Sequence, residues 1–293
     1  MFEKLEKCPL CQSEKFSNFI ICKDHLLTGE SFAITKCNDC SFLFTNPRPL
    51  AENISKYYQS KEYISHADKA TNLTNTVYKI ARHFTLNQKV SLINTLSDQK
   101  TILDYGCGTG DFLLTCKKKG WIINGLEPDD IARNKAISKT DENIYAKIEQ
   151  LNDAKKVSVI TLWHVLEHIP DLNYTMNMLK RKLETKGKML IAVPNIKSLD
   201  AQLYKENWAA YDVPRHLYHF SMQTMKLLLK NHGLKIHNIL PMKLDSFYVS
   251  LLSEKYTNGK SNYVKSFING YKSNIYAKKN NNNYSSVIYI AGK

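Results

Sequence analysis

Two histidines and a glutamate stand close together in the stretch WHVLEHIPD, where His164, Glu167 and His168 form the string H-x-x-E-H. On a helix, residues four apart share one face, so both imidazoles would converge with the carboxylate beside them. This string is the inverted form of a zinc-protease motif. The motif needs a long helix, so the neighbouring elements decide whether that chemistry applies.

The elements around the string disfavour a protease. The stretch VSVITLW (157–163) is continuously apolar and is typical of a buried parallel strand, and His164 follows it directly. Pro170 comes shortly after His168 and leaves no long helix. The carboxyl end of such a strand is where α/β sheets bind ligands. His164 is therefore expected to act there as a general base on an acceptor hydroxyl, since its ordinary pKa is close to neutral.

A glycine-rich turn, DYGCGTGD, supplies the second chemical signal. It connects an expected strand (101–105) to a helix that begins at Asp111, and a second strand (121–127) ends at Glu127. The carboxylates of Asp104 and Asp111 would repel a pyrophosphate, and the spacing is G-x-G-x-G rather than G-x-G-x-x-G. Glu127 can accept hydrogen bonds from both hydroxyls of a ribose. These features favour S-adenosylmethionine, which carries an amino group and a sulfonium, over NAD.

The turn and the histidine string together resemble class I S-adenosylmethionine-dependent methyltransferases. DYGCGTG resembles their first motif, and VLEHIPD resembles the signature that follows their fourth strand. The resemblance implies an α/β fold with a Rossmann-like seven-stranded sheet and the cofactor over its carboxyl edge. The candidate cofactor-binding residues are Asp104, Gly106, Cys107, Gly108, Gly110, Glu127, Pro128 and Trp163.

The quinone-pathway O-methyltransferases have a similar string, E-x-x-E-H, which holds a divalent metal. In this chain His164 stands in place of the first glutamate. Magnesium is therefore left open and is not predicted. His164, His168 and His216 are the candidate catalytic residues. For His168, a structural role through hydrogen bonds that hold the loop is favoured over a catalytic one.

Four of the seven cysteines form two C-x-x-C pairs near the N-terminus, Cys8 with Cys11 and Cys37 with Cys40. Two such turns can complete a tetrahedral S4 zinc site, which has no open position for chemistry. Strand-like stretches lie between the pairs, so residues 1–48 are expected to form a structural zinc ribbon. Cys22 lies on one of these strands and is expected to be a packed thiol.

Two further segments are expected to shape the site. Residues 49–97 look mainly helical and rich in tyrosine (Tyr57, Tyr58, Tyr63 and Tyr78), and they either cover the cofactor and acceptor or simply pack. Residues 194–221 form an expected lid whose D-x-P-R-H-L-x-x-F segment also resembles methyltransferases of this group. Its polar and aromatic residues are Tyr204, Trp208, Tyr211, Asp212, Arg215, His216 and His219. Tyr211, Asp212, Arg215 and His219 are the candidate substrate-binding residues, and packing is the alternative for each.

The rest of residues 98–293 is assigned to the methyltransferase domain, with a basic helical insertion at 253–283. Within it Tyr263, Val264, Phe267, Ile268, Tyr271 and Ile275 form an apolar stripe. Such a stripe most often packs on its own domain, while a membrane surface or nucleic acid is the alternative.

The net charge of +14 among 293 residues suits an acidic partner, or else a lysine-rich solvated surface. The absence of a signal-like N-terminus and of long apolar runs makes a cytoplasmic location the default expectation. The predicted function is methyl transfer to a small-molecule acceptor, with O-methylation ahead of C-methylation and with an anionic acceptor left open. The alternatives are an rRNA or tRNA methyltransferase and a cofactor-binding scaffold without catalysis. The oligomeric state is left open.

Overall fold

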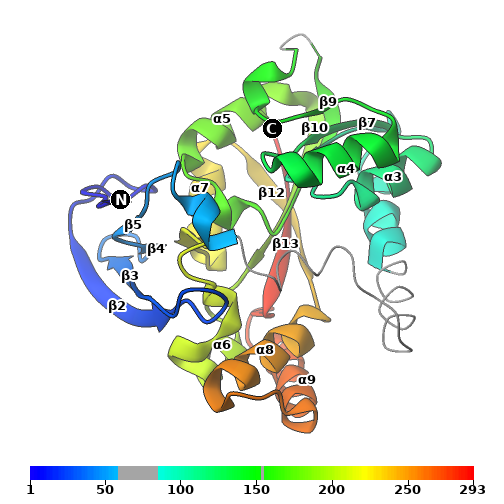
Figure 1. Ribbon diagram of the computed structural model, residues 1–293. Coiled ribbons are helices and arrows are strands. Elements are labelled where there is room, and N and C mark those ends of the chain that lie inside the picture. The colour runs from blue at the N-terminus through cyan, green and yellow to red at the C-terminus, as the bar shows by residue number, and fades with distance from the viewer. Residues whose placement is uncertain (59–84, 153–154) are drawn as a thin grey trace.

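A mixed seven-stranded sheet forms the centre of the molecule (Figure 1). The computed structural model describes residues 1–58, 85–152 and 155–293. The strand order is β12-β13-β10-β9-β6-β7-β8, and β13 runs antiparallel to both of its neighbours. The strands are β6 (Thr101–Tyr105), β7 (Ile122–Leu126), β8 (Ile144–Tyr145), β9 (Val157–Trp163), β10 (Leu183–Pro194), β12 (Lys235–Pro241) and β13 (Ser286–Gly292).

Helices cover both faces of this sheet, because its central strands are apolar on both sides. Neighbouring residues of β6 enter different cores: Ile102 belongs to the cluster under α3 (Asp111–Lys118) and α4 (Asp130–Thr140), and Leu103 to the opposite one. Helical residues 85–94 add Val90 and Ile93 to the first cluster. The resulting sandwich holds the carboxyl ends of β6, β7 and β9 at one edge.

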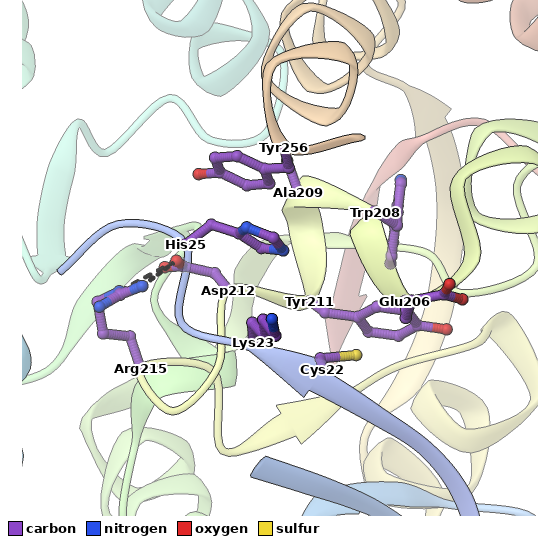
Figure 2. Close-up of a pocket in the computed structure, with 10 residues that line it drawn as sticks. All are labelled: Cys22, Lys23, His25, Glu206, Trp208, Ala209, Tyr211, Asp212, Arg215 and Tyr256. Atoms are coloured by element: carbon purple, nitrogen blue, oxygen red, sulfur yellow. Dashed lines mark hydrogen bonds and ion pairs between the residues drawn. The ribbon is translucent and has the colours of Figure 1, made fainter. Parts of the chain in front are cut away.

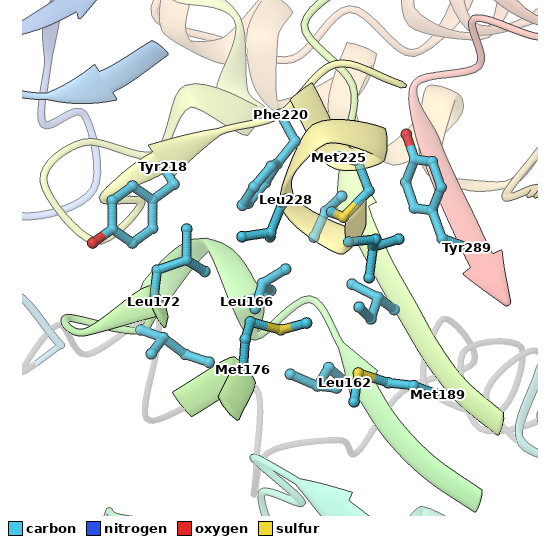
Figure 3. Close-up of a cluster of buried hydrophobic side chains, with 14 of the residues drawn as sticks. Leu162, Leu166, Leu172, Met176, Met189, Tyr218, Phe220, Met225, Leu228 and Tyr289 are labelled. Carbon is cyan, nitrogen blue, oxygen red and sulfur yellow. The ribbon is translucent and has the colours of Figure 1, made fainter. Parts of the chain in front are cut away.

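The opposite core lies under α5 (Leu172–Lys182) and α7 (Met222–Asn231), and Figure 3 shows its centre. Leu162 of β9, Met176 of α5 and Leu228 of α7 are fully buried there. Burial of each such side chain contributes about 1.5–3 kcal/mol. This packing anchors β9 immediately before the histidine string.

A second sheet joins the N-terminus to the predicted lid. Its order is β11-β4-β3-β2, with β2 (Phe16–Lys23), β3 (Ser31–Cys37), β4 (Leu43–Thr45) and β11 (Tyr218–His219). A short pair, β1 (Phe2–Glu3) with β5 (Arg48–Pro49), closes the N-terminal end. Because β11 comes from residues 194–221, the ribbon and the lid share one sheet rather than standing apart.

Most elements expected from the sequence are confirmed, and two differ. The stretch YTMNMLKRKLETKG predicts a helix that ends at Gly187, but α5 ends at Lys182 and β10 begins at Leu183 with an irregularity before Lys188. The stretch ENIYAKI predicts a strand over 142–148, but only the two residues of β8 are a strand, and a short 3-10 helix, η2 (Ile148–Gln150), follows. In both places the residues at the boundary between the two elements are mostly polar, so the sequence did not indicate where one element ends.

The remaining helices lie around the carboxyl edge of the main sheet and below it in Figure 1. They are η1 (Ile54–Tyr58), η3 (Leu166–His168), α6 (Leu199–Tyr204), η4 (Lys205–Asn207), η5 (Ala209–Tyr211), α8 (Asp245–Asn258) and α9 (Tyr263–Lys279). The expected basic helix is thus present as α9. Of the connector tyrosines, Tyr63 and Tyr78 lie outside the described residues. In the part of the chain that is described, every helix is too short or too polar to cross a bilayer.

Candidate active site

The glycine turn packs directly against the histidine string. Gly106 has φ +73°, and a Cβ atom there would lie 2.6 Å from Cγ2 of Val165. Gly108 has φ +54°, but a Cβ atom there would meet nothing within 4 Å. Gly106 is therefore required by the protein's own packing, whereas Gly108 leaves open space beside the backbone. That open space is what the close approach of a ligand needs.

Asp104 lies at the end of β6, immediately before this turn. Its carboxylate is buried and accepts a hydrogen bond of 2.6 Å from Oγ1 of Thr161 on β9. Burial raises the pKa of Asp104 to about 7, although this hydrogen bond and the charge of Lys89 lower it. A buried carboxylate of this kind is stabilised in its ionised form when a cation binds next to it.

Glu127 follows β7 and fixes the other side of the turn. Its two carboxylate oxygens accept hydrogen bonds from the backbone N–H groups of Gly108 (2.8 Å) and Asp129 (3.0 Å). Burial raises the pKa of Glu127 despite these two hydrogen bonds. Each oxygen retains a second lone pair, which can accept a hydrogen bond from a ribose hydroxyl.

The other predicted cofactor-binding residues lie around this turn in different environments. Cys107 is buried and Pro128 is exposed. A Cβ atom on Gly110 would lie 2.9 Å from Ala136 of α4, so this glycine permits close packing of the turn on that helix. Trp163 ends β9, and its ring packs edge-on against Phe112 at 5.8 Å. Its indole N–H is buried and has no hydrogen-bond partner in the described chain.

Lys89 was not predicted from the sequence. It belongs to helical residues 85–94, and its ammonium lies 4.2 Å from the ring centroid of Trp163. Burial lowers the pKa of Lys89, while the charges of Asp104 and Asp245 act in the opposite direction. The connector thus contacts Trp163 at the carboxyl end of β9. No motif or spacing in the sequence indicates that Lys89 lies beside Trp163.

His164 lies between two carboxylates at the carboxyl end of β9. Its Nε2 is 3.0 Å from Oδ2 of Asp245, and its Nδ1 is 3.5 Å from Oε1 of Glu167. Burial lowers the pKa of His164, but Asp245 and Glu167 outweigh it and raise the pKa to about 10. His164 is consequently an imidazolium at neutral pH, and both of its nitrogens already carry protons. Asp245, the first residue of α8, was also missed, because nothing in its local sequence marks it.

His168 differs from His164 in its charge state. Its Nδ1 lies 3.1 Å from the carbonyl oxygen of Arg215 and 2.9 Å from the hydroxyl of Tyr58. Because a carbonyl oxygen only accepts, the proton is assigned to Nδ1, which leaves the lone pair on Nε2. Burial, reinforced by the charge of His216, lowers the pKa of His168 to about 4. His168 is thus neutral at neutral pH, and in the cofactor-free protein it is a weak base.

His216 and Glu167 complete a compact cluster with His168. The Nδ1 atom of His216 lies 2.8 Å from the carbonyl oxygen of Ala210, and the two imidazole rings meet edge to face at 4.5 Å. One donor atom from each of the three residues lies within 4.8 Å of the others. Both carboxylate oxygens of Glu167 are buried, and neither has a hydrogen-bond partner among the described residues. The segment 194–221 therefore places His216 beside the string that follows β9.

The four candidate substrate-binding residues are engaged within the protein. Arg215 is 1 % exposed and donates hydrogen bonds to Asp24 (2.8 Å), to Asp212 (2.7 Å) and to the carbonyl oxygen of Tyr57 (2.9 Å). Tyr211 is buried, and its ring packs edge to face at 5.5 Å against His219. These contacts favour the packing alternative for the lid residues.

Figure 2 shows the hollow that these lid residues line together with β2. His25 and Tyr256 stack over it at 4.4 Å, and the Arg215–Asp212 ion pair closes one side. Its volume is about 10 Å³, which is room for about one water molecule. The hollow is too small for an organic acceptor.

The four predicted metal-binding cysteines converge at the N-terminus. Sγ of Cys8 lies 3.6 Å from that of Cys40, and Sγ of Cys11 lies 3.5 Å from that of Cys37. A tetrahedral site with zinc–sulfur distances of about 2.3 Å separates its sulfurs by about 3.8 Å. The geometry is therefore compatible with zinc. Cys22 lies apart from this group and is buried, as expected.

Comparison with known proteins decides the family. Residues 79–239 match the methyltransferase domain family. The chain belongs to this family. The match confirms the predicted methyltransferase and agrees with the seven-stranded sheet and its glycine turn.

Relatives of this methyltransferase include two ubiquinone biosynthesis O-methyltransferases. The protein from Coxiella burnetii is 28% identical over 120 residues, which cover 38% of this chain and 50% of the relative. The protein from Rickettsia bellii is 24% identical over 144 residues, which cover 46% and 60%. The chain spans about half the length of the curated relatives it matches.

Solved structures share the fold of this methyltransferase. Magnesium protoporphyrin IX methyltransferase from Synechocystis PCC 6803, with bound SAH, superposes with a TM-score of 0.51 at 14% identity. The superposition covers 80% of this chain and 96% of that one. The mycolic acid cyclopropane synthase CmaA1 gives a TM-score of 0.50 at 16% identity, covering 70% and 83%. These likenesses confirm the predicted fold class.

Proposed function

We propose that this methyltransferase transfers the methyl group of S-adenosylmethionine to a hydroxyl of a small-molecule acceptor. The observation that carries the proposal is the contact between Val165 and the turn at Gly106. This contact holds the string from His164 to His168 against the expected cofactor site. The names of the two O-methyltransferase relatives support the same type of reaction.

The cofactor would be bound by the two carboxylates at the carboxyl edge of the sheet. Asp104 would hold the methionine amino group. An adjacent cation stabilises the ionised carboxylate and so lowers the pKa that burial raises. Glu127 would accept hydrogen bonds from the ribose hydroxyls. The open space at Gly108 would admit the cofactor next to the backbone.

We assign the role of general base to His168 rather than to His164. An imidazolium with a pKa of about 10 cannot take a proton at neutral pH, whereas neutral His168 has a free lone pair on Nε2. Burial makes His168 a weak base, but the carboxylates of Glu167 and Asp212 act to raise its pKa and would stabilise the protonated ring. As His168 accepts the acceptor's hydroxyl proton, the oxygen attacks the methyl carbon in line and the carbon–sulfur bond breaks. Glu167 would then stabilise the new imidazolium, and His164 would orient Glu167.

The cluster of Glu167, His168 and His216 has donor atoms that could bind a divalent metal. The resemblance to the quinone-pathway enzymes left such a metal open. Two imidazoles and one carboxylate suit Zn²⁺ or Fe²⁺ better than Mg²⁺, which prefers oxygen ligands. A bound ion would polarise the acceptor oxygen. Cationic His164 lies 3.5 Å from Glu167, however, and it would repel the ion while already compensating that carboxylate. We therefore propose a metal-independent reaction.

Methyl-labelled S-adenosylmethionine and a fractionated cell extract test the proposal. Label in small polar or lipid material supports it, and NMR of the product distinguishes a methyl ether from a new carbon–carbon bond. RNase-sensitive label would replace it with the RNA methyltransferase alternative. Cofactor binding without label in any fraction would favour the scaffold.

The role of His168 is tested with His168→Gln, and His232→Gln serves as the matched control. His232 is also buried and hydrogen-bonded, through Asn177 at 2.8 Å, but it lies outside the cluster. We expect His168→Gln to lower kcat by about 10²–10⁴-fold with SAH affinity unchanged. An unchanged kcat in this variant would contradict the assignment.

A further inference from the structure

Helix α9 exposes its large apolar side chains and buries its small ones. The α9 face, as we call its outward stripe, comprises Tyr263, Val264, Phe267, Ile268, Tyr271 and Ile275, and each is at least 40% exposed. The buried residues of α9 are Ser266, Gly270, Ser273 and Ala277. The prediction that this stripe most often packs on its own domain is wrong here. Contiguous exposed apolar patches of this kind mark interaction sites.

Specific contacts fix this orientation of the helix. Oγ of Ser273 donates a 2.6 Å hydrogen bond to buried Asp200 of α6. Oγ of Ser246, on α8, donates to the carbonyl oxygen of Gly270 at 3.1 Å. Because the polar side of α9 satisfies buried groups of α6 and α8, rotation that hides the α9 face would leave those groups unpaired. The outward direction of the apolar side chains is therefore built in.

The neighbouring end of α8 extends the apolar surface. Phe247 stacks on Phe267 at 5.3 Å, and Leu244 and Tyr248 are 60% and 53% exposed. Asn274 of α9 donates a 2.9 Å hydrogen bond to the carbonyl oxygen of Lys243. Figure 1 shows α8 and α9 side by side at the bottom of the view.

The charges on α9 are all positive. The helix carries Lys265, Lys272, Lys278 and Lys279, and its sequence contains no Asp or Glu. Lys265 pairs with Glu254 of α8 at 3.0 Å. Lys272 and Lys279 lie along the edge of the apolar stripe at helical spacing, where long side chains can extend to lipid headgroups. A second copy of this chain would bring like charges together, which disfavours a dimer through this face.

We propose that the α9 face binds the surface of an anionic lipid bilayer. Tyrosine and aliphatic side chains flanked by lysines are typical of a helix that lies in the plane of the interface. Asp245, at the start of α8, contacts His164, so the bound surface would lie on the element that reaches the candidate active site. The proposal does not depend on the identity of the methyl acceptor.

Vesicle sedimentation with the full chain tests this proposal. The vesicles contain either phosphatidylcholine alone or phosphatidylcholine mixed with phosphatidylglycerol. We expect binding to the anionic vesicles that weakens with added salt, because the lysine contribution is screened. No binding to the anionic vesicles would overturn the proposal.

An apolar variant and a matched control then locate the contact. We expect Val264→Gln with Phe267→Gln and Tyr271→Gln to reduce binding by about tenfold or more. The control is Ile122→Gln with Ile131→Gln, whose side chains are 67% and 68% exposed elsewhere, and binding should persist. Equal losses in both variants would contradict the proposed face.

A charge variant completes the test. Lys272→Gln with Lys278→Gln and Lys279→Gln should reduce vesicle binding by about 100-fold, at about fivefold for each lysine. The control removes the same number of lysines near the opposite edge of the sheet, at Lys156, Lys180 and Lys293.

Two further readouts separate the other occupants of this face. A dimer in light scattering that the apolar variant converts to monomer would assign the face to a second copy. RNA binding that competes with vesicles and disappears in the apolar variant would assign it to RNA. Either result would replace the membrane proposal.

Discussion

The glycine turn permits a prediction in which two similar substitutions have different consequences. Gly106 and Gly108 both have positive φ, so alanine at either position carries a backbone strain of about 1–2 kcal/mol. Only at Gly106 would the new methyl group collide with the protein, at 2.6 Å from Val165. Overpacking of this kind costs about 1–3 kcal/mol.

We therefore expect Gly106→Ala to destabilise the cofactor-free protein by about 2–5 kcal/mol and Gly108→Ala by about 1–2 kcal/mol. Urea unfolding without cofactor measures both values. For SAH, calorimetry should show a loss of affinity of about tenfold or more in Gly108→Ala, because its methyl group would occupy the open space beside the turn. Stability and cofactor affinity thus report on different sides of the same turn.

A double variant tests the steric explanation directly. Val165→Ala removes the colliding methyl groups, so the combination Gly106→Ala with Val165→Ala should be less destabilised than the sum of the single changes by about 1–2 kcal/mol. Additive changes in free energy would refute the collision with Val165. Equal urea midpoints for Gly106→Ala and Gly108→Ala would refute the difference between the two positions.

Three other predictions follow from contacts described above. Cys8→Ser should lower both the Tm and the zinc content measured by elemental analysis, whereas Cys22→Ser should leave the zinc content unchanged. Equal zinc contents in the two variants would contradict the S4 site. Arg215→Met should destabilise the protein by about 3–5 kcal/mol in urea unfolding, because it leaves the buried Asp24 carboxylate without its cationic partner, and a near-neutral result would contradict this structural role. The pKa of His164 is raised to about 10 in the folded state, so its ion pairs stabilise fully below about pH 6.5 and this stability is lost as the pH rises towards 10. The urea midpoints of the wild type and of His164→Gln should consequently converge between pH 6 and pH 10, and a constant difference would contradict this charge state.

The sequence was sufficient where a local pattern reflects a single physical requirement. A continuous apolar run predicted β9, because strands of a parallel sheet are buried on both faces. The C-x-x-C pairs predicted the cysteine cluster, because each turn brings two sulfurs together. The glycine turn predicted the ligand edge, because few other sequences allow a close backbone approach.

The sequence was insufficient where contacts come from distant segments. Asp245 reaches His164 only because α8 begins at the carboxyl edge of the sheet. This contact helps to make His164 positively charged, whereas a neutral histidine was expected. Lys89 meets Trp163 through tertiary packing, with no spacing that signals it. The orientation of α9 depends on the hydrogen bonds from Ser273 to α6 and from Ser246 of α8 to Gly270, so the apolar stripe alone predicted the wrong side.

The N-terminal sheet has an order of assembly that its position in the sequence conceals. Its fourth strand, β11, lies far along the chain, and buried Asp24 is bonded to Arg215 across 191 positions. A ribosome that has released the first hundred residues has therefore delivered all four clustered cysteines but not the strand that covers β4. Closing such a distant contact is slow relative to local folding. The emerging N-terminal half must wait with an open sheet edge until the catalytic half has been made, and a metal ion held by the cysteines would keep it ordered during that delay.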